Sequence, residues 1–119
     1  MSTNVTGFKT FPASAAICAF RRVSLNSSGQ LAYATASVKG IGVTRDDASG
    51  AGGLVTVQLF NQGTAEIRIS ATASFTTGGI AYGASDGRIQ GVAATGAAAI
   101  GIVTESVASA TDVIEIIPA

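Results

Sequence analysis

Short apolar runs separated by turn-forming clusters make up most of the chain. The clearest run spans residues 54–60, which are mostly β-branched or apolar, and residues 65–69 alternate strictly between apolar and charged side chains. Such alternation predicts strands with one buried and one wet face. Further strands are expected at residues 21–25, 30–34, 38–44, 80–82, 88–90, 100–104 and 112–117, with another piece beginning at Phe75. We therefore predict an all-β fold, a small β-barrel or β-sandwich of short strands.

The strand pattern occurs twice, at an offset of just under sixty residues. The aligned segments are residues 23–31 with 81–89, 41–44 with 100–104, and 54–57 with 113–116. Each half would hold a Ser/Asp-Gly turn, an Ile-Gly-aliphatic strand and a final apolar strand. The alternative is chance similarity in a sequence rich in Ala, Gly and Val. A true repeat predicts two pseudo-repeated halves that pack as a pseudo-symmetric barrel without exposed strand edges, joined by residues 64–77.

The first twelve residues follow a different pattern. They are polar apart from Phe8 and Phe11, which flank Lys9, and no periodicity begins before Ala13. Two phenylalanines in a polar tail favour an extended N-terminal arm that docks on a partner, although a frayed terminus fits equally well. The expected organisation is an arm over residues 1–12 followed by a single β domain over residues 13–119.

The chain has few charged residues, and for this reason we expect it to work in an assembly rather than as a free monomer. Only 12% of the 119 residues are charged, seven positive and seven negative, whereas soluble domains carry about 25%. A chain with so few charges is expected to cover part of its surface with copies of itself or a partner; the alternative is a compact monomer with a Ser/Thr-rich surface. The balanced charge predicts no nucleic-acid binding, and no apolar run reaches the length of a spanning helix.

The sequence offers little for catalysis or metal binding. It contains no His, and its one cysteine, Cys18, has apolar neighbours and is expected to be a buried thiol. Asp46 and Asp47 form the only adjacent carboxylate pair, in a Gly-rich loop, where a solvated turn is favoured over a calcium site. Tyr33 and Tyr82 are expected to cap the core with surface hydroxyls. We therefore expect a non-enzyme without cofactor or metal.

The basic residues at the start of the first predicted strand are candidates for contact with a partner. Arg21 and Arg22 should lie on opposite faces of that strand. One of them could pair with an acidic group of a partner, although solvated side chains are the favoured reading.

Two stretches of the sequence resemble the capsid decoration (cement) proteins of tailed bacteriophages. The first runs Gly-Ile-Gly-Val-Thr over residues 40–44, then an Asp/Ala/Gly loop, then Gly-Gly-Leu-Val-Thr-Val-Gln-Leu over residues 52–59. The second comprises residues 79–89, 100–103 and 112–116. The resemblance covers about residues 20 to 117, and its motifs are compositional and loosely spaced.

The resemblance implies a structural protein of the virion. The polar N-terminus and the single cysteine lead us to expect that it folds in the host cytoplasm. Such a protein would sit on the outer capsid surface as a homotrimer and stabilise the shell by bridging major capsid subunits. It also implies that Phe8, Lys9 and Phe11 contact the shell, and we add Arg21 and Arg22 as candidate contacts. It carries over no catalytic residue.

Two other functions remain open. One is a carbohydrate- or receptor-binding module of a phage fibre or a bacterial surface protein, which would expose Tyr33 or Tyr82. The other is a metal-dependent hydrolase that uses Asp46 and Asp47. Fold-level analogy alone does not decide between these functions and the capsid protein.

Overall fold

The described part of the chain is built almost entirely from short antiparallel strands. The computed structural model describes residues 8–60, 67–72, 75, 77–91, 96–104 and 113–118. The strands are β1 (Phe8–Pro12), β2 (Arg22–Leu25), β3 (Leu31–Tyr33), β4 (Gly42–Thr44), β5 (Leu54–Leu59), β6 (Ile67–Ser70), β7 (Ile80–Gly83), β8 (Ile89–Gln90), β9 (Ala99–Val103) and β10 (Val113–Pro118). A 3₁₀ turn, η1 (Ser85–Gly87), lies between β7 and β8. The all-β prediction is confirmed.

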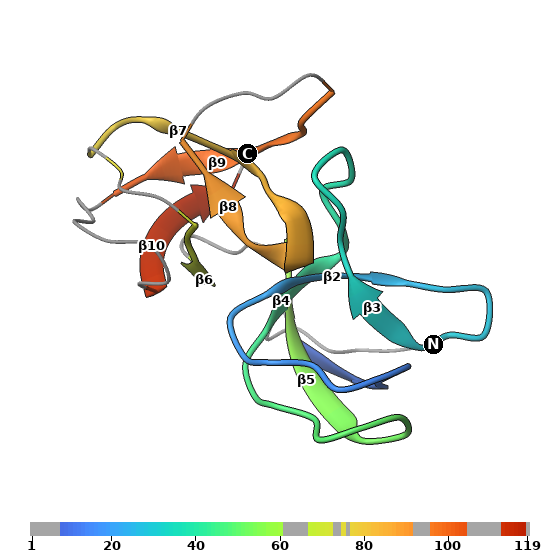
Figure 1. Ribbon diagram of the computed structural model, residues 1–119. Coiled ribbons are helices and arrows are strands. Elements are labelled where there is room, and N and C mark those ends of the chain that lie inside the picture. The colour runs from blue at the N-terminus through green and yellow to red at the C-terminus, as the bar shows by residue number, and fades with distance from the viewer. Residues whose placement is uncertain are drawn as a thin grey trace.

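The strands form two five-stranded sheets with the same connectivity. The first has the order β1-β5-β4-β2-β3 and the second the order β6-β10-β9-β7-β8, so each strand of the second sheet is the counterpart of the strand five places earlier (Figure 1). Equivalent strands start 57 to 59 residues apart; β2 and β7, for example, start at residues 22 and 80, and β5 and β10 at residues 54 and 113. The internal repeat is therefore real and extends over the whole described fold.

Each sheet curls until its edges meet. The residue that follows the first strand makes a parallel bridge to the third strand, Ala13 to Leu31 in one sheet and Ala71 to Ile89 in the other. A backbone hydrogen bond of 2.9 Å accompanies each bridge, from Ser14 N to Leu31 O and from Thr72 N to Ile89 O. We call the two units the N-barrel (β1–β5) and the C-barrel (β6–β10). The halves thus form one small barrel each, rather than one barrel between them.

Two segments that sequence patterns placed outside the repeat are its first strands. Residues 8–12, expected in the arm, form β1 and pair with β5 from Phe8–Gln58 to Pro12–Leu54. The counterpart β6 overlaps the strand predicted at residues 65–69, which the repeat alignment left in the connection between the halves, and it pairs with β10. The sequence pattern hid β1, because tertiary pairing decides whether a short edge segment becomes a strand. Residues 1–7 of the expected arm lie outside the described residues.

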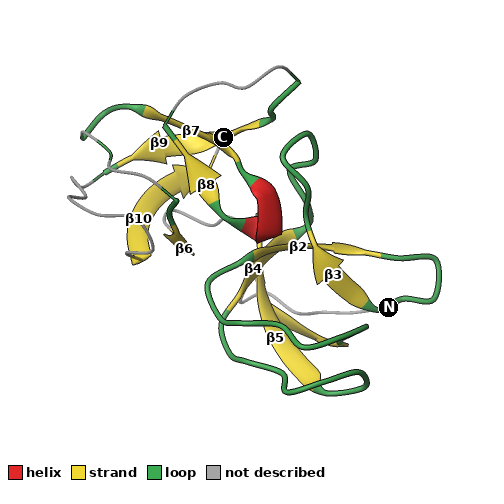
Figure 2. Cartoon of the chain, in the orientation of Figure 1, coloured by secondary structure: helices red, strands yellow, loops and turns green. Residues whose placement is uncertain are grey.

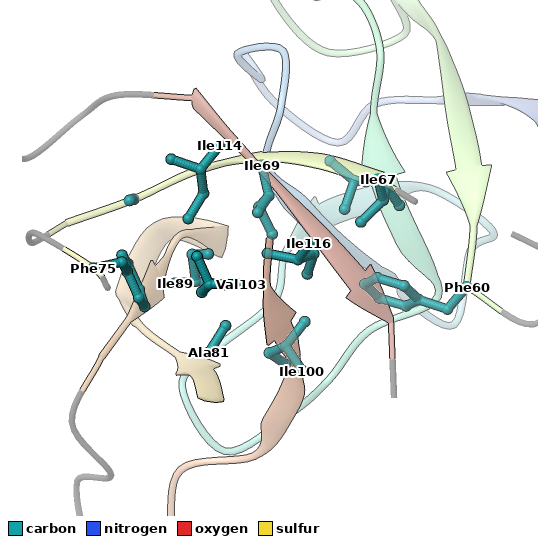
Figure 3. Packing of buried hydrophobic residues seen from close by; sticks show 12 residues of the cluster. Phe60, Ile67, Ile69, Phe75, Ala81, Ile89, Ile100, Val103, Ile114 and Ile116 are labelled. Atoms are coloured by element: carbon teal, nitrogen blue, oxygen red, sulfur yellow. The ribbon is translucent and has the colours of Figure 1, made fainter. Parts of the chain in front are cut away.

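The two barrels have separate cores that meet at one place. The N-barrel core consists of Ala13, Ile17, Val23, Leu31, Ala48, Val55 and Val57. The C-barrel core is larger and rich in isoleucine, and Figure 3 shows its side chains converging between the strands. It also includes Val43 and Phe60 from the N-barrel, and both are almost fully buried. The barrels therefore pack against each other through apolar side chains, since burying such groups is the main stabilising term in folding.

The Ile-Gly-aliphatic motif of each half has a steric cause. A Cβ atom at Gly42 would overlap the backbone oxygen of Gln58, and a Cβ at Gly101 would overlap that of Ile117. These are equivalent pairs on β4–β5 and β9–β10. Only glycine allows the strands to approach this closely at that position.

The turns between the second and third strands of each half also follow the predicted pattern. In the N-barrel, Asn26 Oδ1 accepts hydrogen bonds from the backbone N–H groups of Ser28 and Gln30, both at 2.9 Å. Gly29 has a φ of 77° and its counterpart Gly87 a φ of 71°. Glycine adopts this left-handed conformation without steric penalty, which accounts for its place at the end of both turns.

Candidate interaction surface

A buried arginine lies at the junction of the two barrels. Arg22 is 0% exposed. The three shortest hydrogen bonds of its guanidinium all go to backbone carbonyls: Nη1 to Val38 O at 2.5 Å, Nη2 to Ala84 O at 2.7 Å and Nε to Arg88 O at 3.1 Å. Val38 belongs to the N-barrel, whereas Ala84 and Arg88 belong to the C-barrel, so one side chain joins both.

Burial has an electrostatic consequence for this arginine and removes it from the candidate contacts. Desolvation lowers the pKa of Arg22 from 12.5 to about 10, so the group remains charged at neutral pH. Backbone carbonyl dipoles stabilise this charge. Because Arg22 has no exposed surface, it cannot be the capsid contact that the sequence suggested.

Close backbone contacts surround Arg22. The turn η1 lies against β2 and β3, between the two barrels (Figure 2). A Cβ at Gly87 would overlap the backbone oxygen of Arg22, and one at Gly83 would overlap the backbone oxygen of Ala36. The N–H of Ala98 donates to that same Ala36 oxygen at 2.9 Å. The two barrels therefore pack backbone against backbone at this junction, which requires glycine at two positions of the C-barrel.

Arg21 lies on the other face of the strand and is partly exposed. Its guanidinium stands 5.4 Å from the ring centroid of Tyr33, and its Nη1 donates to Asp86 O at 2.9 Å. Tyr33 Oη accepts a hydrogen bond from the backbone N–H of Cys18 at 2.8 Å. Burial raises the pKa of Tyr33 above its usual value of 10.0. The ring and hydroxyl of Tyr33 thus both have partners within the chain.

The cysteine differs from its prediction. Cys18 is exposed, not a buried thiol. The preceding residue, Ile17, is buried and makes an antiparallel bridge with Ala48. Neighbouring side chains in an extended segment point to opposite sides, so burial of Ile17 turns Cys18 toward solvent.

The expected contact residues of the arm divide between the two faces of β1. Phe8 is partly buried, with the Arg45 guanidinium 5.5 Å from its ring centroid. Lys9 is exposed and pairs across the strands with the buried Val57, and its ammonium lies 5.6 Å from the ring of Phe11. Phe11 packs against the N-barrel core. Phe8 therefore does not share a face with Lys9 and Phe11.

An apolar row on the outside of the C-barrel was missed by the sequence patterns. Ile80, Ile102 and Ile117 lie side by side across three neighbouring strands, because Ile102 pairs with both of the others. They are 48%, 49% and 49% exposed. The signal was present: Ile102, Val113 and Ile117 are apolar at outward-facing positions of strands whose inward-facing positions are also apolar, which indicates strands covered on both faces.

A shallow hollow lies where the barrels meet, with polar walls. Arg45 and Gln58 line it from the N-barrel, and Ile67 and Arg68 from the C-barrel. Arg45 Nη1 donates to Gln58 Oε1 at 3.1 Å, and Arg68 stands 3.9 Å from the carboxylate of Glu115. The hollow is thus a place for polar contacts at the junction.

The adjacent carboxylates of Asp46 and Asp47 both accept hydrogen bonds from backbone N–H groups. Asp46 Oδ1 accepts a hydrogen bond from Thr56 N at 2.9 Å, and Asp47 Oδ1 accepts one from Ala19 N at 2.6 Å. No group of three metal-ligating side chains occurs among the residues that the structure describes. Within those same residues, no helix has the length and hydropathy required to cross a membrane.

Comparisons with known proteins find similarity in structure but none in sequence. No protein-family model and no curated protein matches the chain. A solved structure that does match is the crystal structure of the head fiber gp8.5 N base in bacteriophage phi29, with a TM-score of 0.74. The chain shares the fold of that fiber base. The match covers 94% of both chains at 14% sequence identity, so it establishes the architecture of the whole double-barrel unit.

Proposed function

We propose that this chain is a structural protein of a phage virion that sits on the outer surface of the capsid. The observation that carries the proposal is the fold shared with the phi29 head fiber base over 94% of both chains. The low charge and the exposed apolar row support a chain that works inside an assembly. Because fold alone does not fix function, binding to a capsid is the property to test.

In the finer form of the proposal, the chain decorates the capsid as a homotrimer and stabilises it by bridging major capsid subunits. Several weak contacts per trimer would then add up to tight retention. Of the residues considered for this contact, Lys9 is exposed and Phe8, Phe11 and Arg21 are partly exposed, so these four are the candidates that remain. The role is mechanical, without turnover, cofactor or bound nucleic acid.

The test is reconstitution on capsids of the phage or prophage whose genome encodes the chain. Particles stripped of the protein are mixed with purified chain and separated on a density gradient. Saturable co-sedimentation supports the proposal, and a chain that stays at the top of the gradient at every ratio rejects it. Heating separates the finer roles: stabilisation predicts that decorated particles release DNA at a higher temperature than bare ones, whereas a mere attachment point leaves that temperature unchanged.

The second candidate is a carbohydrate- or receptor-binding module of a fibre, because the structural neighbour is itself part of a head fiber. Sugar binding usually requires exposed aromatic rings, but the Tyr33 ring lies beneath Arg21 and its hydroxyl is hydrogen bonded. A glycan array decides: specific binding that Tyr82→Ala abolishes would favour this function, and an array without hits removes it.

A further inference from the structure

The internal repeat places two equivalent rows of side chains on the outer faces of the two barrels. In the N-barrel the row is Arg22, Val43 and Gln58, paired in register across β2, β4 and β5. In the C-barrel the equivalent row is Ile80, Ile102 and Ile117, across β7, β9 and β10. The two rows occupy the same place in the same fold.

These equivalent rows have different surroundings in a single chain. Arg22 and Val43 are both 0% exposed because the C-barrel covers them. The isoleucines of the C-barrel row are each about half exposed. The chain thus contains one barrel-to-barrel contact, while the second surface of the same kind is left open and is purely apolar.

The covering surface also has an open counterpart. The C-barrel covers the N-barrel row with its β7–β8 turn, where Gly83 and Gly87 approach the N-barrel backbone. The equivalent residues in the N-barrel are Leu25 and Gly29, in the β2–β3 turn. Leu25 is 41% exposed, and a Cβ at Gly29 would meet nothing within 4 Å. Each chain therefore has one open row and one open turn.

The sizes of the side chains at the two contacts are complementary. Within the chain, Gly83 leaves room for Arg22, whose Nη2 would lie 3.2 Å from a Cβ at that glycine. At the open surfaces the small residue is replaced by Leu25 and the large one by the shorter Ile80. An isoleucine opposite a leucine fills the space that an arginine fills opposite a glycine, and it does so without a buried charge. Apolar replacement of a buried ionic group is a recognised way to keep a close contact.

We propose that the row of Ile80, Ile102 and Ile117 binds the β2–β3 turn of a second copy of this chain. In this contact, the C-barrel row of one chain would meet the N-barrel turn of another chain, just as the N-barrel row meets the C-barrel turn within one chain. It is head-to-tail, because the row and the turn lie on different barrels, and a head-to-tail contact closes into a ring when its rotation allows. The proposal rests on the repeat; only the number of copies, three, comes from the proposed function.

The first experiment measures the molar mass of the full chain in solution without capsids. The wild type is expected to sediment as an oligomer of the 11.7 kDa chain. Ile102→Lys, at the centre of the row, is expected to give a folded monomer, because a lysine would be buried without a partner. The matched control is Leu54→Lys: Leu54 is 68% exposed and lies on the N-barrel outside the row, so this variant should remain oligomeric. A monomeric wild type, or an Ile102→Lys variant that stays oligomeric, overturns the proposal.

The second experiment identifies the paired residues by crosslinking. In a Cys18→Ser background, a chain with Leu25→Cys is mixed with a chain with Ile80→Cys and oxidised. The mixture should form covalent dimers, and each variant alone should not. Dimers from Ile80→Cys alone would show two rows facing each other, and no dimers in the mixture would show that the turn is not the partner; either result rejects the head-to-tail contact.

These results are distinguishable from failure of the proposed function. A chain that forms head-to-tail oligomers but never binds a capsid refutes the capsid role and leaves this contact standing. A chain that binds capsids as a monomer refutes this contact and leaves the capsid role standing.

Discussion

Replacing Arg22 by methionine tests whether its guanidinium clamps the two barrels together. Methionine keeps most of the volume and length of the side chain but has no donors, so the variant removes hydrogen bonds without opening a large cavity. The three carbonyls nearest the guanidinium, those of Val38, Ala84 and Arg88, belong to the backbone and stay in place. The carbonyls of Val38 and Ala84 would lose this donor, whereas Arg88 O would keep the hydrogen bond from Ala84 N at 2.9 Å.

The size of the effect follows from these contacts. A buried acceptor left unsatisfied costs about 1–3 kcal/mol, so the carbonyls of Val38 and Ala84 together could cost up to about 6 kcal/mol. Removing a buried charge returns part of this, since burial disfavours the charged form and lowers the pKa of Arg22 to about 10. We expect a net loss of about 3 kcal/mol, a large part of the ~5–15 kcal/mol that stabilises a typical domain.

Urea unfolding followed by circular dichroism measures this loss. With a slope of about 1–3 kcal/mol per molar urea, the midpoint should fall by about 1–3 M. The matched control is Arg21→Met, because Arg21 is partly exposed and makes one hydrogen bond of 2.9 Å to Asp86 O; its midpoint should move by less than a third as much. If Arg22→Met is as stable as Arg21→Met, the carbonyls find other donors and the clamp is not what holds the barrels together.

Three further outcomes are expected. Gly29→Ala should lower the free energy of unfolding by about 1 kcal/mol, because alanine is strained at a positive φ. Gly87→Ala should lower it at least twice as much, because its Cβ would also overlap the backbone oxygen of Arg22. Equal losses in thermal unfolding would contradict the close contact between Gly87 and Arg22. Burial raises the pKa of Tyr33, so the stability that this residue contributes is present below pH 10 and is lost as the pH rises through the higher pKa of the folded state. The ultraviolet titration of Tyr33, taken as the difference between wild type and Tyr33→Phe, should have its midpoint above pH 10. A midpoint at or below pH 10 would refute the raised pKa. Cys18 is exposed, so native protein should react fully with a thiol reagent, and a thiol that reacts only after unfolding would disagree.

Much of the architecture could be predicted because strand signals are local. Alternation at residues 65–69 and the apolar run at 54–60 reflect burial of one face or both, and turn clusters such as Asn26 to Gly29 stop a strand wherever they occur. The repeat was visible for the same reason: two equivalent barrels need the same turns and the same close-approach glycines at equivalent places. The edge strand β1 was not predicted, because its few residues become a strand only by pairing with β5. The strand at β6 was predicted, but its role as the first strand of the second half was not, because that role depends on its pairing with β10.

The candidate contacts were harder to predict, because exposure is a tertiary property. Phe8, Lys9 and Phe11 are close in sequence, but the strand places them on two faces. The sequence predicts Arg22 as a surface cation, but the second barrel covers it. The sequence predicts Cys18 as a core residue, but the neighbouring Ile17 is the one that points inward and Cys18 is exposed. No local pattern contains the information that another part of the chain lies on top of a residue.

The sequence alone determined that the chain is all-β, built from two similar halves, poor in charge and without histidine chemistry, because these properties depend on residue type and short-range order. Tertiary structure decided that each half closes on itself, that an arginine joins the halves, and that one of two equivalent rows is covered while the other is open. Those outcomes depend on which surfaces meet, and surfaces meet through contacts between residues that are far apart along the chain.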